Sequence, residues 1–169
     1  MISNLEYAPY YEQYIIPLSK SGKSIFQTLE ESQHNFDATL RNIDNDKHSY
    51  SYAEGKWTIK EIIQHIIDTE RIFCYRALCF ARNDKTSLPG FDQDFFVLND
   101  NANERDFNDL LNEMKTLRES TIQLYKSFSK DVLLRIGNAS GNDMSVRAIG
   151  YLFAGHQNHH LKIINERYL

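Results

Sequence analysis

Hydrophobic residues recur at helical spacing in four stretches of the chain. The first stretch runs from about Ser19 to Asn42, and its apolar positions are separated by four or seven residues: Ile25, Leu29, Phe36 and Leu40. This spacing places the side chains on one face of a helix, so it predicts an amphipathic helix that packs against a core. Pro17 lies just ahead of the predicted helix, and a polar run from Asp44 to Ser51 follows it.

The second stretch has the most clearly marked start. Thr58 is followed three residues later by Glu61, a pair typical of a capping box, in which the hydroxyl and the carboxylate each accept a hydrogen bond from a backbone N–H group. Trp57 stands where a hydrophobic staple faces Ile62. A broad apolar face continues to Ala81 and consists of Ile59, Ile62, Ile63, Ile66, Ile67, Phe73, Ala77 and Phe80. These features predict a long helix that begins after Thr58.

Two more helices are predicted in the second half of the chain. The third covers roughly Glu104 to Ser129, and the fourth begins near Ser145, a residue type that favours the N-cap. The connection between them, from Gly137 to Asp143, is short and rich in turn-forming residues. The loop from Arg82 to Phe96 mixes turn formers with large aromatic residues, so we expect it to pack against the helices. The count predicts an all-α four-helix bundle, whose packing order the sequence leaves open.

Length, composition and charge narrow the class of protein. The chain has 169 residues, 41% of them hydrophobic, which fits a single domain over residues 1–169. Three prolines and seven glycines favour helices over a many-stranded fold. The net charge of −4 comes without a cluster of lysine and arginine, which argues against nucleic-acid binding. The chain shows neither a secretory signal nor 18 consecutive apolar residues, so we expect a cytoplasmic protein that does not bind membranes.

Two histidines in the fourth predicted helix are spaced for metal binding. His156 and His160 are four residues apart, so their side chains lie about 40° apart on one helix face and one turn apart along it. Such a pair can chelate a divalent metal if a third ligand comes from elsewhere. It can equally be a pair of solvent-exposed or hydrogen-bonded core histidines. Both residues continue the apolar stripe of the helix, which favours an inward orientation, whereas His159 is rotated by about 100° and is expected at the rim.

A third candidate ligand lies in the second predicted helix. His65 stands among isoleucines beside the apolar face, where it is either a metal ligand or a core-edge histidine bonded to a carbonyl group. The sequence does not place it beside the last helix. A carboxylate-bridged di-iron site needs two Glu-x-x-His units, and the pair formed by Glu31 and His34 is the only one. His34 and His48 are therefore expected at the surface.

Three blocks of the sequence resemble the DinB/YfiT-like superfamily of four-helix metalloproteins. The blocks are the second predicted helix from Lys56 through Arg82, the loop from Leu88 to Asp94, and the segment from Ala154 to Leu161. The resemblance implies a metal, usually nickel or zinc, held by one histidine of the second helix and two of the fourth, which map onto His65, His156 and His160. It also implies a homodimer, a prediction that the tyrosine-rich N-terminal run supports as a surface patch to be covered.

Two functions remain open at this point. The first is a metal-dependent enzyme of the thiol transferase or hydrolase type, in which the ion activates a thiol or water. It would act on a small molecule. The resemblance implies that the thiol would be a low-molecular-weight one such as mycothiol, bacillithiol or glutathione. The second is a non-catalytic, metal-containing stress-response or binding module. No side-chain nucleophile with its own base is recognisable. Four acidic residues are possible general bases or neighbours of the metal ligands, but each fits a solvated or structural charge better, so no catalytic base is named: Asp68, Glu70, Asp92 and Asp94.

Overall fold

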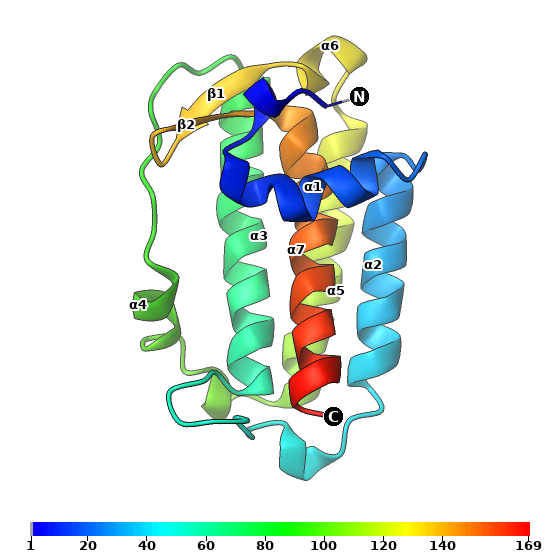
Figure 1. Ribbon diagram of the computed structural model, residues 1–169, viewed down its shortest axis with the longest axis vertical. Coiled ribbons are helices and arrows are strands. Elements are labelled where there is room, and N and C mark those ends of the chain that lie inside the picture. Colours follow the sequence, from blue (N-terminus) through cyan, green and yellow to red (C-terminus); the bar gives the residue numbers. More distant parts are fainter. Residues whose placement is uncertain (1) are drawn as a thin grey trace.

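The computed structural model describes residues 2–169, and within them four long helices form a bundle (Figure 1). These helices are α2 (Ile25–Leu40), α3 (Ile59–Ala81), α5 (Phe107–Lys126) and α7 (Val146–Arg167). The all-α class and the four-helix bundle predicted from the sequence are confirmed. The packed pairs are α2 with α7, α2 with α5, α3 with α5 and α3 with α7.

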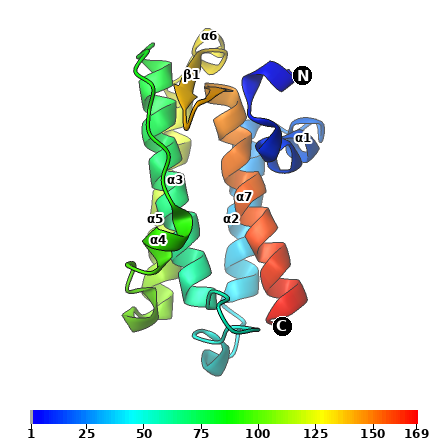
Figure 2. The same ribbon diagram turned by 60° about the vertical axis from the view of Figure 1, so that its left-hand side comes forward.

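Two pairs of long helices that follow one another in the chain, α2 with α3 and α5 with α7, occupy opposite corners of the bundle. Figure 2 shows α3 beside α5 on one side and α7 beside α2 on the other. The connections from α2 to α3 and from α5 to α7 therefore cross the bundle diagonally. One consequence matters for the site, because α3 and α7, which carry the three candidate histidines, become neighbours that run in opposite directions (Figure 1).

Local capping explains where the two histidine-bearing helices begin. The Thr58 hydroxyl accepts a hydrogen bond from the backbone N–H of Glu61, and the Glu61 carboxylate accepts one from the backbone N–H of Thr58. At the start of α7, the Ser145 hydroxyl accepts a hydrogen bond from the backbone N–H of Ala148. Both predicted starts are confirmed, and the capping bonds satisfy backbone donors that a bare helix end would leave without partners.

The predicted first helix is wrong at its start, because the chain breaks into two helices there. Helix α1 covers Glu12–Ser19, and α2 begins only at Ile25. Gly22 between them has a φ of 78°, a left-handed conformation that suits glycine. Ser24 and Gln27 then form a second capping box that starts α2. The short helix α1 crosses the upper half of the bundle and packs on α7 (Figure 1).

The tyrosines near the N-terminus belong largely to the core. Tyr7 and Tyr14 are only 6% and 7% exposed, whereas Tyr10 is 63% exposed. The run therefore does not form the broad surface patch expected from the sequence. The homodimer stays a prediction that rests on the family resemblance alone.

The connection before α7 is a β-hairpin, which the sequence analysis did not predict. Strand β1 (Ile136–Ala139) pairs antiparallel with β2 (Asn142–Ser145) across a turn at Ser140 and Gly141. The preceding loop joins this hairpin, since the backbone N–H of Leu88 donates to Asn138 O (3.0 Å) and the N–H of Ser140 donates to Leu88 O (3.0 Å). Leu88 is buried, so the first part of the loop packs as expected, while Phe95 in the short helix α4 (Gln93–Val97) is exposed.

Two apolar clusters fill the bundle, one near each end, and polar residues separate them. Phe73, Leu152 and Tyr125 belong to the first cluster, and Ile63, Leu110 and Ile164 belong to the second. The buried polar side chains between them include Glu70, Arg118, Gln157 and His65. A layer of this kind inside a bundle is costly unless its members are paired or bind a ligand.

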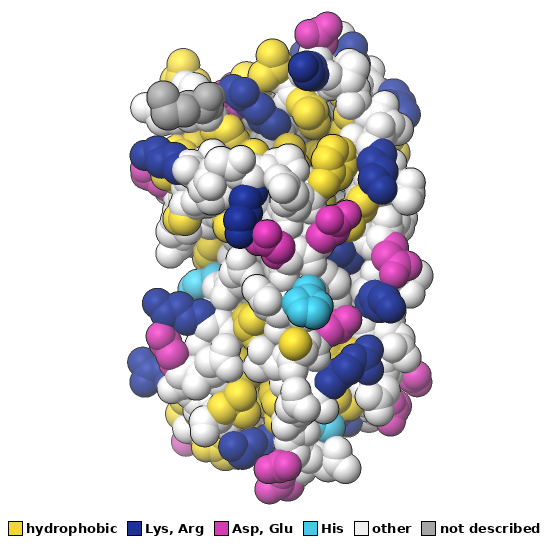
Figure 3. Space-filling model, turned by 90° about the vertical axis from the view of Figure 1, so that its right-hand side faces the viewer, with side chains coloured by type: hydrophobic (Ala, Val, Ile, Leu, Met, Phe, Trp, Pro, Cys, Tyr) yellow, Lys and Arg dark blue, Asp and Glu magenta, His cyan; other side chains and the backbone are white. Residues whose placement is uncertain are grey.

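On the face that includes α2, lysine and arginine side chains are interspersed with acidic ones (Figure 3). Charges of both signs are therefore locally balanced on this side of the molecule.

The remaining described elements are short. They are the 3-10 helices η1 (Asn4–Glu6), η2 (Pro9–Tyr11), η3 (Asn45–Lys47) and η4 (Ala102–Glu104), and the one-turn helix α6 (Lys130–Leu133). Among residues 2–169, none of the helices combines the length and the apolar character that a membrane span requires.

Candidate metal centre

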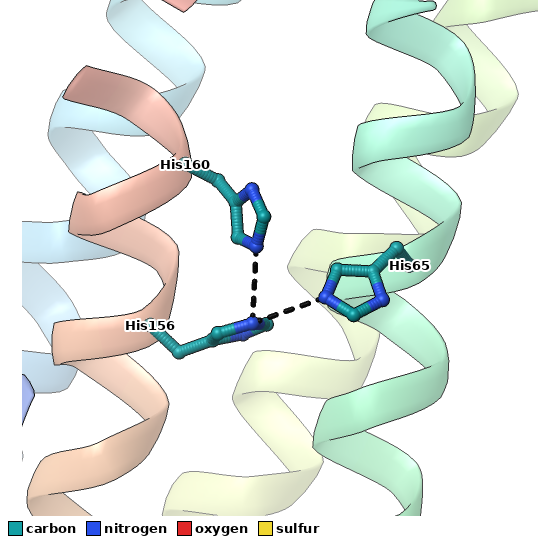
Figure 4. A group of neighbouring side chains, drawn as sticks. All are labelled: His65, His156 and His160. Atoms are coloured by element: carbon teal, nitrogen blue, oxygen red, sulfur yellow. Dashed lines mark hydrogen bonds between the residues drawn. The ribbon is translucent and has the colours of Figure 1, made fainter. Parts of the chain in front are cut away.

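Three histidines from two helices point at one another inside the bundle. His65 extends from α3, and His156 and His160 extend from successive turns of α7 (Figure 4). The Nε2 atom of His156 lies 3.1 Å from Nε2 of His65 and 3.1 Å from Nε2 of His160. One ring nitrogen from each histidine falls in a group whose atoms all lie within 4.8 Å of one another. The fold thus brings together the three residues that the family resemblance had linked, although helical spacing alone did not place His65 beside the last helix.

Hydrogen bonding among the rings does not account for this arrangement. A neutral imidazole has, at Nε2, either one lone pair or one N–H group. His156 Nε2 can therefore take part in only one of the two short contacts as an ordinary hydrogen bond. By contrast, ligand nitrogens about 2.0–2.1 Å from a tetrahedral ion lie about 3.3 Å apart, close to the two short separations. The donor set and its convergence fit a divalent transition metal such as zinc or nickel.

Burial keeps the three rings in the neutral form that binds metals. It lowers the pKa of His65 to about 4, since this side chain is only 4% exposed. The pKa values of His156 and His160 lie well below the usual range, chiefly because of burial and secondarily because neighbouring histidines repel a second positive charge. All three rings are therefore unprotonated near pH 7, each with a lone pair for coordination.

Aromatic side chains hold the histidine rings from both sides. The indole of Trp57 lies 4.8 Å from the His65 ring and 6.4 Å from the His160 ring, measured between centroids. The Tyr14 ring lies 6.0 Å from the ring of His156 and 5.2 Å from that of His159. His159 is partly buried and packs between Tyr14 and His160, which agrees with the predicted rim position.

A glycine beside the site allows α1 to approach α7. A Cβ atom added to Gly155 would lie 2.1 Å from the backbone oxygen of Tyr14, a distance that no side chain can occupy. Gly155 directly precedes His156, so this close helix contact fixes the backbone at the first candidate ligand of α7. The sequence segment containing Gly155 was noted only as part of the family resemblance, and its packing role required the structure.

A buried ion pair lies beside the histidines and was missed by the sequence analysis. The Arg118 guanidinium donates to the Glu70 carboxylate (2.7 Å), to the Gln157 side-chain oxygen (2.9 Å) and to the Ser32 hydroxyl (2.7 Å). Arg118 lies four residues from both Met114 and Ile122 on the apolar face of α5, a signal that could have marked it as inward-facing. Glu70, once a candidate general base, is therefore an ion-paired structural carboxylate.

The other candidate acids and histidines lie outside the convergent group. Asp68 accepts a hydrogen bond from Gln64 (2.9 Å), and Asp92 caps α4 by accepting from the backbone N–H of Asp94. His34 is exposed, as predicted. The prediction for His48 is wrong in part, because this residue is half-buried, stacks on Phe107 with a centroid distance of 3.5 Å, and bonds to Ile43 O.

Cavities reach the histidines from two directions. One of about 160 Å³ lies between the N-terminal tyrosines and α3, and both His65 and His156 line it. The other, of about 260 Å³, is lined by His160 together with Trp57, Asp94 and Tyr168. The three rings thus border open space large enough for small molecules, whereas a structural ion is usually enclosed by four protein ligands.

Comparison with known proteins agrees with this architecture. The family model described as the DinB superfamily matches residues 28–164. A protein of Oceanobacillus iheyensis named as a putative metal-dependent hydrolase is 22% identical over 135 residues, which cover 79% of this chain and 77% of that protein.

Three solved structures share the fold. YfiT from Bacillus subtilis, described as a probable metal-dependent hydrolase with an unusual four-helix bundle topology, has a TM-score of 0.74 at 17% identity, over 97% of this chain and 95% of that one. A mycothiol-dependent maleylpyruvate isomerase has a TM-score of 0.66 at 14% identity, over 80% of this chain and only 57% of the isomerase. The DinB-like protein YjoA from Bacillus subtilis has a TM-score of 0.60 at 19% identity, over 85% of this chain and 88% of that one. With a family match over most of its length, the chain belongs to the DinB superfamily.

Proposed function

We propose that the protein is a metal-dependent enzyme that uses His65, His156 and His160 to bind one divalent transition metal, zinc or nickel. The observation that carries the proposal is the convergence of three neutral imidazole nitrogens beside open cavities. A bound ion of this kind supplies Lewis acidity and lowers the pKa of a thiol or water toward neutrality. The reaction would then be attack by that thiol or water on a small electrophile, of the thiol-dependent S-transferase type or the hydrolase type.

The surrounding residues prepare the site for this chemistry. Three neutral histidines leave the positive charge of a bound ion uncompensated, which favours an anionic nucleophile in the cavity. Trp57 and Tyr14 pack against the histidine rings and restrict their orientations. Glu70 and Arg118 neutralise each other and add no net charge next to the histidines.

The names of similar proteins support both versions of the reaction. The Oceanobacillus protein is named as a putative metal-dependent hydrolase and YfiT as a probable one, and a hydrolase would use water. The isomerase is described as mycothiol-dependent and would use a thiol. We favour a low-molecular-weight thiol, because a soft thiolate binds zinc or nickel well. The cavities support an enzyme over the non-catalytic binding module, since a molecule can lie against the histidines.

The test combines metal removal with a screen for turnover. The protein is stripped with a chelator, its helicity is followed by circular dichroism, and a panel of electrophiles is assayed with several thiols and with water before and after metal is restored. We expect turnover to disappear without the metal while the helices remain, because the apolar clusters do not depend on the ion. Turnover that survives complete metal removal would contradict the mechanism, and the absence of turnover with every nucleophile would favour the binding module.

A further inference from the structure

A buried arginine forms part of the wall of the smaller cavity. Arg76 is only 3% exposed and extends from α3, the helix that carries His65. Both residues line the same cavity, together with Thr69. Their positions, 65, 69 and 76, are separated by four and seven residues and so fall along one face of the helix. The cavity therefore connects a candidate metal ligand to a buried positive charge.

Among residues 2–169, no carboxylate forms an ion pair with this guanidinium. The Nη2 atom of Arg76 donates to the backbone oxygen of Pro89 (2.8 Å) and to the Ser140 hydroxyl (3.2 Å), which are both uncharged. The ion pairs found among residues 2–169 do not include Arg76. Arg118, the other deeply buried arginine, pairs with Glu70. Arg76 is thus a buried guanidinium whose only recorded partners are neutral, an arrangement that costs free energy unless an anion is supplied.

The groups around Arg76 hold its guanidinium in place for a ligand. The guanidinium carbon lies 4.7 Å from the centroid of the Phe73 ring and 5.9 Å from that of Phe91. Tyr11 lines the same cavity. The oxygens of Pro89 and Ser140 both accept from Nη2, so other N–H donors of the guanidinium remain for a ligand in the cavity. Burial lowers the pKa of Arg76, but the group keeps its charge at neutral pH.

A second polar group in the cavity wall also lacks a partner. The Thr69 hydroxyl oxygen is buried and makes no hydrogen bond within the part of the chain that the structure describes. Thr69 is 8% exposed and lies one helical turn after His65. A buried hydroxyl of this kind destabilises the folded state if it stays unbonded. Both Thr69 and Arg76 would be satisfied by a molecule that occupies the cavity.

We propose that Arg76 is the anion-binding residue of this cavity and that the substrate processed at the three histidines carries a carboxylate group. The inference rests on the proposed function and deepens it by assigning the substrate a chemical class. A carboxylate fits better than a phosphate because it is planar, carries one charge and matches a single guanidinium. His65 and Arg76 lie three turns apart on α3, about 16 Å along the helix axis, so the carboxylate would lie at Arg76 and the reacting end of the substrate toward the histidines.

The structural alternative is that Arg76 only ties α3 to the loop at Pro89 and to the hairpin at Ser140. That role predicts that a substitution changes stability and leaves ligand affinity untouched. Our proposal predicts a change in the affinity for anionic ligands that neutral ligands do not share. A pair of probes of similar shape, one anionic and one neutral, therefore separates the two roles.

The experiment uses calorimetric titration of the full-length, chelator-treated protein with benzoate and with benzamide, its neutral counterpart. A cavity of about 160 Å³ accepts a benzene-sized ring, since an engineered cavity of about 150 Å³ binds benzene. Wild-type protein should bind benzoate more tightly than benzamide. Arg76→Gln should weaken benzoate binding by about 10- to 100-fold, as expected for lost hydrogen bonds to a charged group, and should leave benzamide binding unchanged. Arg76→Lys keeps the charge without the planar fork and should fall between.

Arg82→Gln is the matched control, because Arg82 follows α3 and is exposed. It should leave the affinities for both probes unchanged. Equal affinity of the wild type for benzoate and benzamide, or no measurable benzoate binding, would overturn the proposal. Full benzoate affinity in folded Arg76→Gln or Arg76→Lys would do the same. If Arg76→Gln does not fold, the preference of the wild type for benzoate over benzamide and the benzoate affinity of Arg76→Lys still test the proposal.

Metal-free protein keeps this test separate from that of the proposed function. If benzoate binding depends on Arg76 but the protein takes up no metal, the anion site is supported and the metal-dependent reaction is refuted. If the protein binds metal stoichiometrically but shows no preference for benzoate, the metal centre is supported and the carboxylate assignment is refuted.

Discussion

Replacing Arg118 with methionine should destabilise the bundle strongly, because the change leaves a buried carboxylate without its cation. Arg118 and Glu70 are only 1% and 2% exposed. After the substitution, the Glu70 carboxylate would keep the Thr121 hydroxyl as its recorded hydrogen-bond donor (2.7 Å). The oxygens of Ser32 and Gln157 would also lose the guanidinium that bonds to them. Breaking a buried ion pair from one side costs about 3–5 kcal/mol.

Urea denaturation followed by circular dichroism measures this loss. With an m-value of about 2 kcal/mol/M, the expected shift of the midpoint is about 1.5–2.5 M toward lower urea. Domains of ordinary stability, about 5–15 kcal/mol, can lose this much and still fold at 25 °C. The control is Arg71→Met, which removes an ion pair with Glu113 in which Arg71 is 51% exposed, and which should cost at most about 1 kcal/mol.

A double substitution tests the stated cause. Glu70→Leu combined with Arg118→Met removes both charges, so it should be less destabilising than Arg118→Met alone, although Ser32 and Gln157 still lose their partner. If Arg118→Met costs no more than Arg71→Met, or if the double variant is as unstable as the sum of the two single variants, the argument from an uncompensated buried charge is refuted.

Three other predictions follow from single contacts. Burial raises the pKa of Glu6, but hydrogen bonds from Arg147, Ser3 and Ser145 outweigh this effect and lower the pKa from 4.5 to about 2. The free energy of unfolding that Glu6→Gln removes should therefore be present above pH 4.5 and vanish as the pH falls toward 2. Urea denaturation of both proteins across this pH range measures the difference. Gly155→Ala should displace α1, lower the free energy of unfolding by about 1–3 kcal/mol and reduce the metal content. Denaturation and elemental analysis measure these two effects, and wild-type values in both would contradict the packing argument. Light scattering should give twice 19.8 kDa for a homodimer, and the monomer mass at all concentrations would refute that prediction.

Features set by neighbouring residues were predictable from the sequence. The starts of α3 and α7 depend on Thr58 and Ser145, whose hydroxyls act within the first helical turn. The break before α2 was also encoded locally, since Ser24 and Gln27 form the same type of capping box, but the continuous apolar spacing obscured it. The turn at Ser140 and Gly141 lies between strands of only four residues, too short to show an alternating pattern.

Features set by distant contacts were not predictable in this way. His65 meets His156 because α3 and α7 are neighbours in the bundle, and helical spacing says nothing about which helices are adjacent. The family resemblance, rather than the periodicity, linked these residues before the structure did. Arg76 escaped notice because the residues that contact it, such as Phe91 and Ser140, come from the loop after α3 and from the hairpin, and spacing within one helix does not reveal such contacts.

Metal content is the most direct test of the account, because the proposed chemistry depends on three histidines holding one ion. Elemental analysis of untagged protein should find about one equivalent of zinc or nickel per chain. His65→Ala, His156→Ala and His160→Ala should each abolish stoichiometric binding, while His34→Ala, at an exposed position, and His48→Ala, whose ring stacks on Phe107, should retain it. A full equivalent of metal in folded His65→Ala would contradict the three-histidine site.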